Sequence, residues 1–176
     1  MSAERIIWTI GHSTRSLDEF TGLLKDFQIQ CLVDIRSLPG SNRYPHFNKE
    51  NLEKSLPAHH IRYVHLIHLG GRRKVFPGSK NTGWRLDAFR GYADYMETSQ
   101  FTGAIKELES IALEQRTAYM CAESLWWRCH RSLVSDYLKL NGWQVLHIMG
   151  PKKTVEHTYT QPAKIVEGKL NYEKRE

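Results

Sequence analysis

The sequence predicts an α/β fold, in which a mainly parallel sheet of about five strands carries helices on both faces, as in Rossmann-like three-layer proteins. Two observations lead to this prediction. Short apolar runs alternate with helical stretches, and the runs are apolar throughout, which is typical of parallel strands buried on both faces. The runs also end in polar or ionisable residues. Ligands bind beyond the carboxyl ends of the strands in such sheets, so we expect the functional site there.

Length and composition limit the class of protein. A chain of 176 residues corresponds to about one domain, and we expect residues 1–150 to form a single α/β domain, followed by a polar, basic segment, 151–176, that is extended or loosely packed. The 40% hydrophobic and 25% charged content is typical of globular proteins. No apolar run approaches the roughly 20 residues of a membrane span, and no signal-peptide pattern opens the chain. We therefore expect a cytoplasmic protein that does not enter a membrane.

The charge and the cysteine count bear on partners and redox state. The net charge of +6 favours an anionic small molecule or a nucleic acid as partner. Three cysteines is an odd number, and a chain of this length does not need disulfide bonds to be stable, so we interpret them as reduced thiols. Cys31 opens an apolar run and is expected to be buried. No cofactor and no oligomeric state can be read from the sequence.

The N-terminal residues form the first strand–helix–strand unit. An apolar run at 6–10 precedes a helix that begins at Ser16, with Glu19 three residues later as in a capping box. A second strand, 31–35, follows. The helical crossover makes the two strands parallel.

The middle of the chain alternates loops with a helix and a strand. Proline and glycine make residues 38–48 a loop, and a helix over 48–56 follows, which Pro57 ends or kinks. A third strand covers 61–66. The stretch 70–85 is glycine-rich, basic and without periodicity, and a connection of this length is more often functional than idle.

The remaining elements are two helices, a strand, a helix and a last strand. Their expected ranges are 89–96, 101–113, 117–121, from Cys129 or His130 to Asn141, and 144–148.

The stretch from Tyr119 to Arg131 contains more reactive side chains than packing needs. A strand that leads into a helix presents free backbone N–H groups and the positive end of the helix dipole at the connecting loop, which favours an anion. Cys129, His130 and Arg131 lie at or just before the first helical turn, where the pKa of a thiol is lowered. Cys121 leaves the end of the strand and should face the same crevice.

Catalytic and structural interpretations of this stretch both remain open. Cys121 or Cys129 could be a nucleophile, with Glu123 or Asp34 transferring a proton. Alternatively, both cysteines pack as small hydrophobes beneath the two tryptophans that follow Leu125. Counted from Cys121, the position that carries arginine in cysteine-dependent phosphatases is Trp127, so that motif is absent.

A metal site is a further alternative. Soft and borderline ligands would come from this stretch and from neighbouring strands: Cys121, Glu123, Cys129 and His130, with His12 or His147. However, the spacing is not that of paired zinc ligands, and the adjacent Cys129 and His130 point in different directions on a helix. We therefore assign no metal ligand.

Two other strand ends carry candidate anion-binding residues. Asp34 and Arg36 should lie on the same side of their strand, where Arg36 could hold a phosphate, or the two could form an internal ion pair. His12 and Ser13 could contact an anion at the start of the following helix. Alternatively, Ser13 or Ser16 simply caps that helix.

Basic loops provide candidate substrate contacts. These residues are Arg43, Gly70, Gly71, Arg72 and Arg73, with nearby aromatic residues. Guanidinium groups beside aromatic rings suit phosphate backbones and stacked bases. A solvated basic loop is the alternative.

Several short motifs, in order along residues 6–150, resemble the family known as domain of unknown function 488. The matching segments are Thr9–Ser13, Val33–Ser37 with Pro39, Phe47–Asn48, Leu69–Gly71, Phe89–Met96, Met120–Glu123, Cys129–Arg131 and His147–Ile148. The resemblance implies membership of the family and assigns no reaction.

The sequence favours an enzyme over a binding module. In the leading hypothesis, one polar pocket at the carboxyl ends of the strands acts on a phosphorylated, nucleotide or nucleic-acid-derived substrate. The rival hypothesis is a non-catalytic nucleic-acid-binding module that uses the basic loops. A third is a metal-binding protein that uses the Cys/His/Glu cluster.

Overall fold

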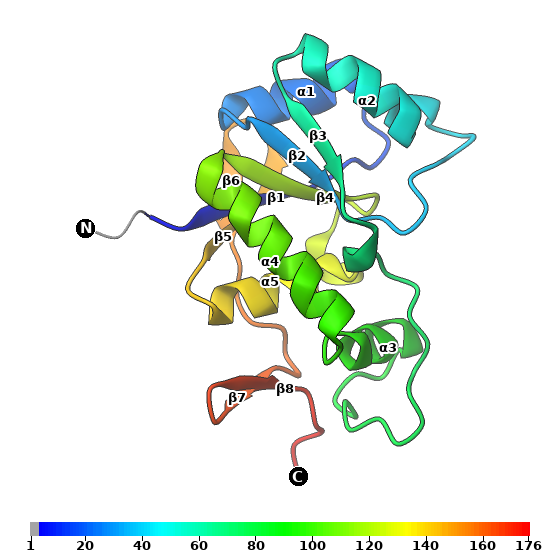
Figure 1. Cartoon of the computed structure of the whole chain (residues 1–176), viewed down its shortest axis with the longest axis vertical. Coiled ribbons are helices and arrows are strands. Elements are labelled where there is room, and N and C mark those ends of the chain that lie inside the picture. The colour runs from blue at the N-terminus through cyan, green and yellow to red at the C-terminus, as the bar shows by residue number, and fades with distance from the viewer. Residues whose placement is uncertain (1–3) are drawn as a thin grey trace.

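A computed structural model describes residues 4–176 and contains a six-stranded sheet with the strand order β3-β2-β4-β1-β5-β6. The first five strands in this order are parallel, and β6 runs antiparallel to β5 (Figure 1). The strands are β1 (Ile6–Gly11), β2 (Cys31–Asp34), β3 (Arg62–His65), β4 (Thr117–Cys121), β5 (Gln144–Gly150) and β6 (Lys153–Glu156). The predicted α/β class is confirmed.

Helices cover both faces of the sheet. Helices α1 (Leu17–Asp26) and α2 (Lys49–Ala58) pack on one face, while α3 (Asp87–Tyr95), α4 (Ser99–Glu114) and α5 (Arg131–Leu140) lie on the other side (Figure 1). Short 3₁₀ turns at Pro45–Phe47, Ile67–Leu69 and Trp126–Arg128 connect these elements. The predicted capping box is present, because Ser16 Oγ accepts from Glu19 N and Glu19 Oε1 accepts from Ser16 N.

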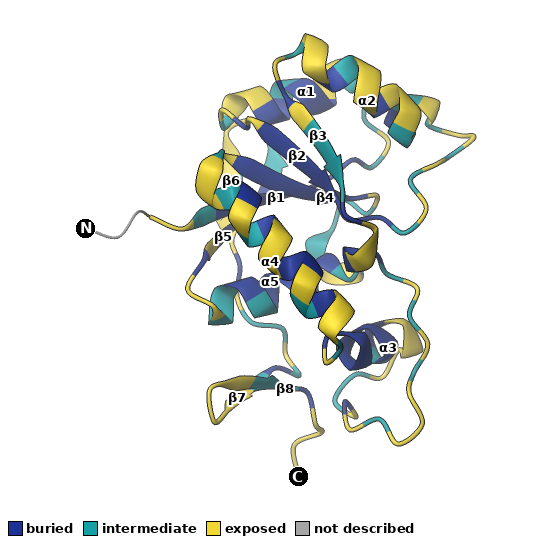
Figure 2. Ribbon diagram, viewed as in Figure 1, coloured by how far each residue is buried: buried dark blue, intermediate teal, exposed yellow. Residues whose placement is uncertain are grey.

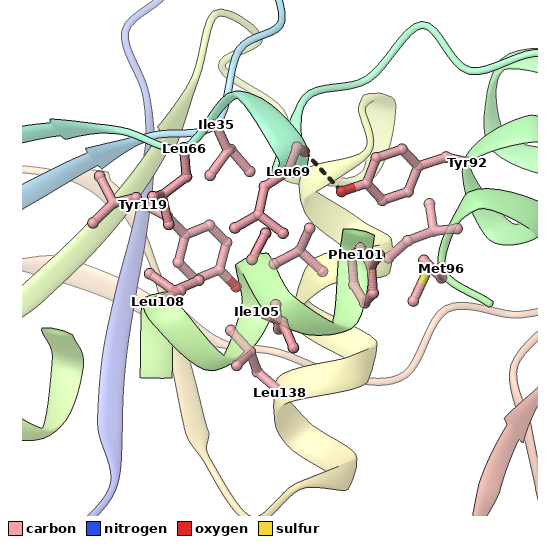
Figure 3. Close-up of a cluster of buried hydrophobic side chains, with 14 of the residues drawn as sticks. Ile35, Leu66, Leu69, Tyr92, Met96, Phe101, Ile105, Leu108, Tyr119 and Leu138 are labelled. Carbon is pink, nitrogen blue, oxygen red and sulfur yellow. Dashed lines mark hydrogen bonds between the residues drawn. The ribbon is translucent and has the colours of Figure 1, made fainter. Parts of the chain in front are cut away.

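Two hydrophobic cores result, one on each face. The core beneath α1 and α2 contains Trp8, Phe20 and Met120, and the core beneath α4 and α5 contains Phe101 and Tyr119. Figure 2 shows β2 and β4 buried along their length, which explains why their sequences are apolar without alternation. Figure 3 shows side chains of α4, among them Ile105 and Leu108, packed in the second core beside Tyr119 of β4.

This second core also fixes the segment after β3. The Tyr92 hydroxyl, from α3, donates to Leu69 O at 2.8 Å (Figure 3). The Tyr95 hydroxyl donates to His68 O at 2.6 Å. Two buried or partly buried hydroxyls therefore hold the start of the glycine-rich stretch against α3.

The C-terminal segment corrects one expectation. Residues 151–176 are not loosely packed: β6 extends the sheet, and β7 (Lys164–Val166) and β8 (Lys169–Asn171) form a small antiparallel hairpin. His157 and Tyr172 are buried, with 1% and 3% of their surface exposed. Hydrogen bonds from polar side chains, rather than a long apolar run, hold this segment against the domain. The composition of the segment therefore did not predict its packing. No helix within residues 4–176 combines the length and the apolar character that crossing a membrane requires.

Candidate functional site

A pocket of about 480 Å³ opens at the carboxyl ends of β2 and β4, beside the start of α5. Seven of the predicted site residues line it: Arg36, Gly71, Arg72, Cys121, Glu123, Cys129 and His130. The other predicted site residues are not part of this lining: Asp34, His12, Ser13, Arg131, Arg43, Gly70 and Arg73. The fold thus brings the reactive stretch after β4 together with the strand end at Arg36.

The two thiols of the stretch lie against each other in this pocket. Cys121 is the last residue of β4 and is held beside β1, since His12 N donates to Cys121 O at 3.0 Å. Cys129 has extended backbone just before α5, and its Sγ lies 3.0 Å from Cys121 Sγ. Only 2% of Cys121 is exposed, whereas Cys129 is half-buried. The two sulfurs share a hydrogen bond, with either one as donor.

The close approach of β1 to the loop after β4 requires glycine at position 11. A Cβ on Gly11 would lie 1.9 Å from Glu123 O, well inside any permitted contact. Because the main chain at Glu123 follows directly from Cys121, a side chain at position 11 would displace the loop that joins the two thiols. The predicted Thr9–Ser13 motif therefore has a steric role at this site.

Arg131 lies beside the thiols and has no carboxylate partner. Only 1% of it is exposed, and its guanidinium donates to Thr9 Oγ1 (3.2 Å), Glu123 O (2.9 Å) and Ser124 O (3.2 Å). Its Nε is buried without an acceptor. Among residues 4–176, no ion pair involves this side chain. A buried positive charge is thus left uncompensated next to the sulfurs.

This environment separates the pKa values of the two thiols. Burial raises the pKa of Cys121, but the hydrogen bond with Cys129 and the positive charge of Arg131 together lower it to about 7. The hydrogen bond to Cys121, with burial, raises the pKa of Cys129 well above its ordinary value, so the lowered pKa expected for Cys129 at the start of the helix is wrong. A thiolate on Cys121 that accepts a hydrogen bond from the Cys129 thiol is therefore the expected form near neutral pH.

A chain of buried hydrogen bonds leads from Arg131 to a distant carboxylate. Arg131 donates to Thr9, whose Oγ1 lies 2.6 Å from His147 Nδ1. His147 Nε2 lies 2.9 Å from His157 Nδ1, and His157 Nε2 lies 2.8 Å from Asp136 Oδ1. When each group donates to the next, from guanidinium to carboxylate, every atom that bridges two neighbours in the chain has a partner of the right kind. We call these five residues the Arg131–Asp136 relay.

The relay places His147 differently from the prediction. The sequence predicted a last strand over 144–148, with His147 near its carboxyl end, but β5 continues to Gly150, so His147 lies inside the strand and is fully buried. Burial, followed by the charges of His157 and Arg131, lowers the pKa of His147 to about 2. The Trp126 ring stacks on it at 4.4 Å. His147 is therefore a neutral, enclosed link and not a rim residue.

Asp136 is anchored by the C-terminal segment. Besides His157, it accepts hydrogen bonds from Thr160 N (3.0 Å), Thr160 Oγ1 (2.5 Å) and Tyr172 Oη (2.9 Å). Four donors around one fully buried carboxylate explain how a polar segment packs so closely.

Asp34 and Arg36 form a saturated pair. Arg36 Nε and Nη2 donate to the two oxygens of Asp34 at 2.9 and 2.7 Å, which is a bidentate ion pair. Asp34 also accepts from Arg36 N and from the Tyr63 hydroxyl. Arg36 donates in addition to Phe47 O at 2.7 Å. This geometry matches the ion-pair alternative, and it leaves the Asp34 carboxylate little capacity to accept a proton from a substrate.

His12 and Ser13 lie outside the pocket lining. His12 Nδ1 bonds to Ser13 O at 2.8 Å, and its Nε2 lies 3.3 Å from Arg36 Nη1. Burial, assisted by the charge of Arg36, lowers the pKa of His12 to about 4, so the ring is neutral at pH 7. The helix cap is Ser16, not Ser13. His12 therefore buttresses Arg36 rather than contributing a positive charge.

His130 is a neutral group in the pocket wall. Its Nε2 lies 2.8 Å from Ile35 O, and burial, together with nearby arginines, lowers its pKa to about 4. A Cβ at Gly71 would lie 3.1 Å from His130 Nδ1, so glycine allows this wall to close. A Cβ at Gly70 would likewise lie 2.4 Å from Ser37 Oγ. Both glycines are explained by close packing.

The basic residues of the predicted substrate loop separate into three groups. Arg72 lines the pocket, with a left-handed backbone (φ 63°). The Arg73 guanidinium stacks 3.7 Å above the Tyr95 ring and donates to Gly70 O. Arg43 is exposed in the loop before α2 and is absent from the lining. Of the three arginines, only Arg72 is available to a ligand in this pocket.

The metal alternative lacks support in the geometry. Within residues 4–176, no group of three or more His, Cys, Asp or Glu side chains is arranged to hold a metal ion. His130 Nε2 faces Ile35 O, and Glu123 Oε1 accepts from Leu125 N, so neither is directed at the sulfurs by these contacts.

A family model for proteins with a domain of unknown function, DUF488, matches residues 16–138. The chain belongs to this family. No curated protein and no solved structure matches the chain. The DUF488 match includes both thiols, Arg131 and Asp136, but it ends before His147 and His157. The relay of this DUF488 protein therefore joins residues inside the matched region to residues on either side of it.

The pocket also contains residues that the sequence interpretation did not select. Arg128, Ser37, Leu86 and Phe89 are among the other residues in the wall of the DUF488 site. Arg128 was detectable, since it lies in the reactive stretch next to Cys129. Leu86 and Phe89 had no such signal, because their position depends on where the tertiary structure places the start of α3 beside the pocket.

Proposed function

We propose that this DUF488 protein is a thiol-dependent enzyme that acts on an anionic substrate, phosphorylated or derived from a nucleotide. One observation carries the proposal: the Cys121–Cys129 sulfur pair lines a pocket beside a buried arginine, Arg131, that has no carboxylate partner. Such a charge stabilises a thiolate and favours anions at the same place.

The proposed roles follow from the contacts. Cys121 is the nucleophile, and Cys129 stabilises its thiolate through their hydrogen bond. Arg72 and Arg128, whose side chains reach the pocket without the ion pair that occupies Arg36, hold the anion. Glu123 lies in the same wall and transfers a proton to or from the leaving group. Asp34 acts indirectly by holding Arg36.

The test measures how the alkylation rate of Cys121 depends on pH, read at the individual cysteine by peptide mass spectrometry. In the wild type we expect a midpoint near pH 7. Cys129→Ala removes the hydrogen bond and should raise the midpoint, slowing the reaction at pH 7 by about tenfold for each unit of pKa. Cys129→Ser keeps a hydroxyl donor and should lie between the two. A Cys121 thiol that stays inert until the protein unfolds would contradict the nucleophile assignment.

Ligand protection tests the anion part of the proposal. Inorganic phosphate and a nucleoside monophosphate should slow alkylation of Cys121, and the Arg128→Gln variant should need a higher concentration of either for the same protection. Lys49→Gln, on the surface of α2, is the matched control and should not change protection. Equal protection of wild type and Arg128→Gln would remove Arg128 from the anion site.

A second candidate function is supported by the adjoining pocket. This cavity, of about 850 Å³, shares Leu86 and Phe89 with the thiol pocket and is lined by Trp84, Trp126, Trp127, Arg85, Lys174 and Arg175. Half of Trp127 is exposed. Indole rings beside cationic side chains suit single-stranded nucleic acid. A binding module would hold a single-stranded oligonucleotide with an affinity that falls steeply with salt and is unchanged in Cys121→Ser.

A further inference from the structure

We infer that Cys121 and Cys129 are a redox-active dithiol, which cycles between two thiols and an intramolecular disulfide. This activity needs only the two sulfurs and an oxidant, so it is independent of the anionic substrate proposed above.

The first argument is the distance between the sulfurs. At 3.0 Å, Cys121 Sγ and Cys129 Sγ are closer than two sulfur atoms that merely pack against each other. A disulfide bond of about 2.05 Å requires them to approach by only about 1 Å more. The two residues are joined by a loop with one short 3₁₀ turn, Trp126–Arg128, rather than by regular structure. A small shift of Cys129 toward Cys121 would allow the S–S bond to form.

The second argument is access. Both cysteines line a pocket that is open to solvent, in contrast to Cys31, which is fully buried in β2. Burial raises the pKa of Cys31 to about 11, which keeps that thiol protonated and unreactive. The chain therefore carries its own internal control: one thiol in the core and two in a pocket.

The third argument is the difference between the two thiols. Arg131 and the hydrogen bond from Cys129 favour the thiolate of Cys121, whereas Cys129 keeps its proton. Arg131 N also lies 3.4 Å from Cys129 Sγ at the start of α5. One sulfur is thus prepared to attack an oxidant, and the other is in position to resolve the product.

The chemistry balances with hydrogen peroxide as the oxidant. The Cys121 thiolate attacks one peroxide oxygen, the O–O bond breaks, and the product is a sulfenic acid plus water once the leaving oxygen is protonated. Cys129 sulfur then attacks Cys121 Sγ, the S–O bond breaks, the S–S bond forms, and a second water leaves with the Cys129 proton. Counting the proton that Cys121 released to solvent when it ionised, the dithiol loses two electrons and two protons, and hydrogen peroxide gains them to become two waters. A low-molecular-weight dithiol reverses the reaction by exchange.

The experiment treats the full chain with hydrogen peroxide and then counts free thiols after denaturation. The wild type should fall from three free thiols to one, with Cys31 remaining. Trypsin cleaves after Arg128, between the two cysteines, so the disulfide should link the peptides Thr117–Arg128 and Cys129–Arg131. Dithiothreitol should separate them and restore three thiols.

Matched variants decide whether Cys129 resolves the product. In Cys129→Ser, the sulfenic acid on Cys121 should persist long enough for dimedone to trap it, and no linked peptide should form. Cys31→Ser should form the same linked peptide as the wild type. The inference would be overturned if peroxide sulfenylates Cys121 in Cys129→Ser but the wild type forms no linked peptide. It would also be overturned if peroxide leaves all three thiols of the wild type and both thiols of Cys129→Ser unreacted.

The outcomes separate this inference from the proposed function. A Cys121 midpoint near pH 7 with protection by phosphate, but no disulfide, would retain the enzyme proposal and reject the dithiol. A reversible disulfide without protection by either anion would do the reverse.

Discussion

Two arginines are buried near the carboxyl edge of the sheet, and they differ in how their charge is balanced. Arg36 makes a bidentate ion pair with Asp34 and a further bond to Phe47 O. Arg131 donates only to neutral oxygens, and its Nε has no acceptor. The first arginine stabilises a loop, whereas the second retains a positive potential that a thiolate or a bound anion can use.

The difference has a physical cause. A buried guanidinium loses its hydration, and a carboxylate in contact offsets that loss while cancelling most of its field. The nearest carboxylate connected to Arg131 is Asp136, at the far end of the relay. Neutral groups therefore orient Arg131 without neutralising it. Several elements must hold those neutral groups in place, including the C-terminal segment that supplies His157.

Breaking the saturated pair should give the largest effect on stability. Arg36→Met leaves Asp34 charged and buried, and we expect it to lower the free energy of unfolding by about 3–5 kcal/mol. Urea denaturation followed by circular dichroism measures this. Lys49→Met is the control, because the Lys49–Glu53 pair is exposed and should cost less than about 1 kcal/mol. Similar losses in the two variants would mean that Arg36 is not a structural charge.

Removing the distant carboxylate should have the next largest effect. Asp136→Ala leaves the donors from His157, Thr160 and Tyr172 without their acceptor, and we expect a loss of about 3 kcal/mol in the free energy of unfolding. Glu107→Ala, which removes an exposed carboxylate on α4, should stay within about 0.5 kcal/mol of the wild type. Limited proteolysis should also cut the C-terminal segment faster in Asp136→Ala. Unchanged proteolysis would show that the segment is anchored elsewhere.

Replacing the unpaired arginine should sharpen the comparison most, although its effect on stability is the smallest. Arg131→Met relieves the desolvation of a charge and loses hydrogen bonds to three oxygens, so we expect a loss of only about 1–2 kcal/mol. The alkylation midpoint of Cys121 should rise, because the Arg131 charge lowers that pKa. Arg128→Met, in the exposed part of the loop, should leave the midpoint unchanged. If Arg131→Met leaves the alkylation midpoint of Cys121 unchanged, the hydrogen bond from Cys129 alone lowers the pKa of Cys121.

The sequence by itself determined the elements of the fold and the position of its reactive stretch. Apolar runs and helical spacing are properties of neighbouring residues, so β2, β4 and the Ser16–Glu19 cap could be recognised locally. The concentration of thiols, imidazole and guanidinium between Cys121 and Arg131 was visible for the same reason.

Only the tertiary structure decided how charges and sulfurs are partnered. Thr9 and His147, which lie side by side in the relay, are 138 residues apart in the chain, and no local pattern predicts such a contact. Periodicity likewise gave no reason to pair Arg36 and leave Arg131 unpaired. That choice depends on which strand ends and loops the fold brings together, because a buried charge interacts with its spatial surroundings rather than with its neighbours in sequence.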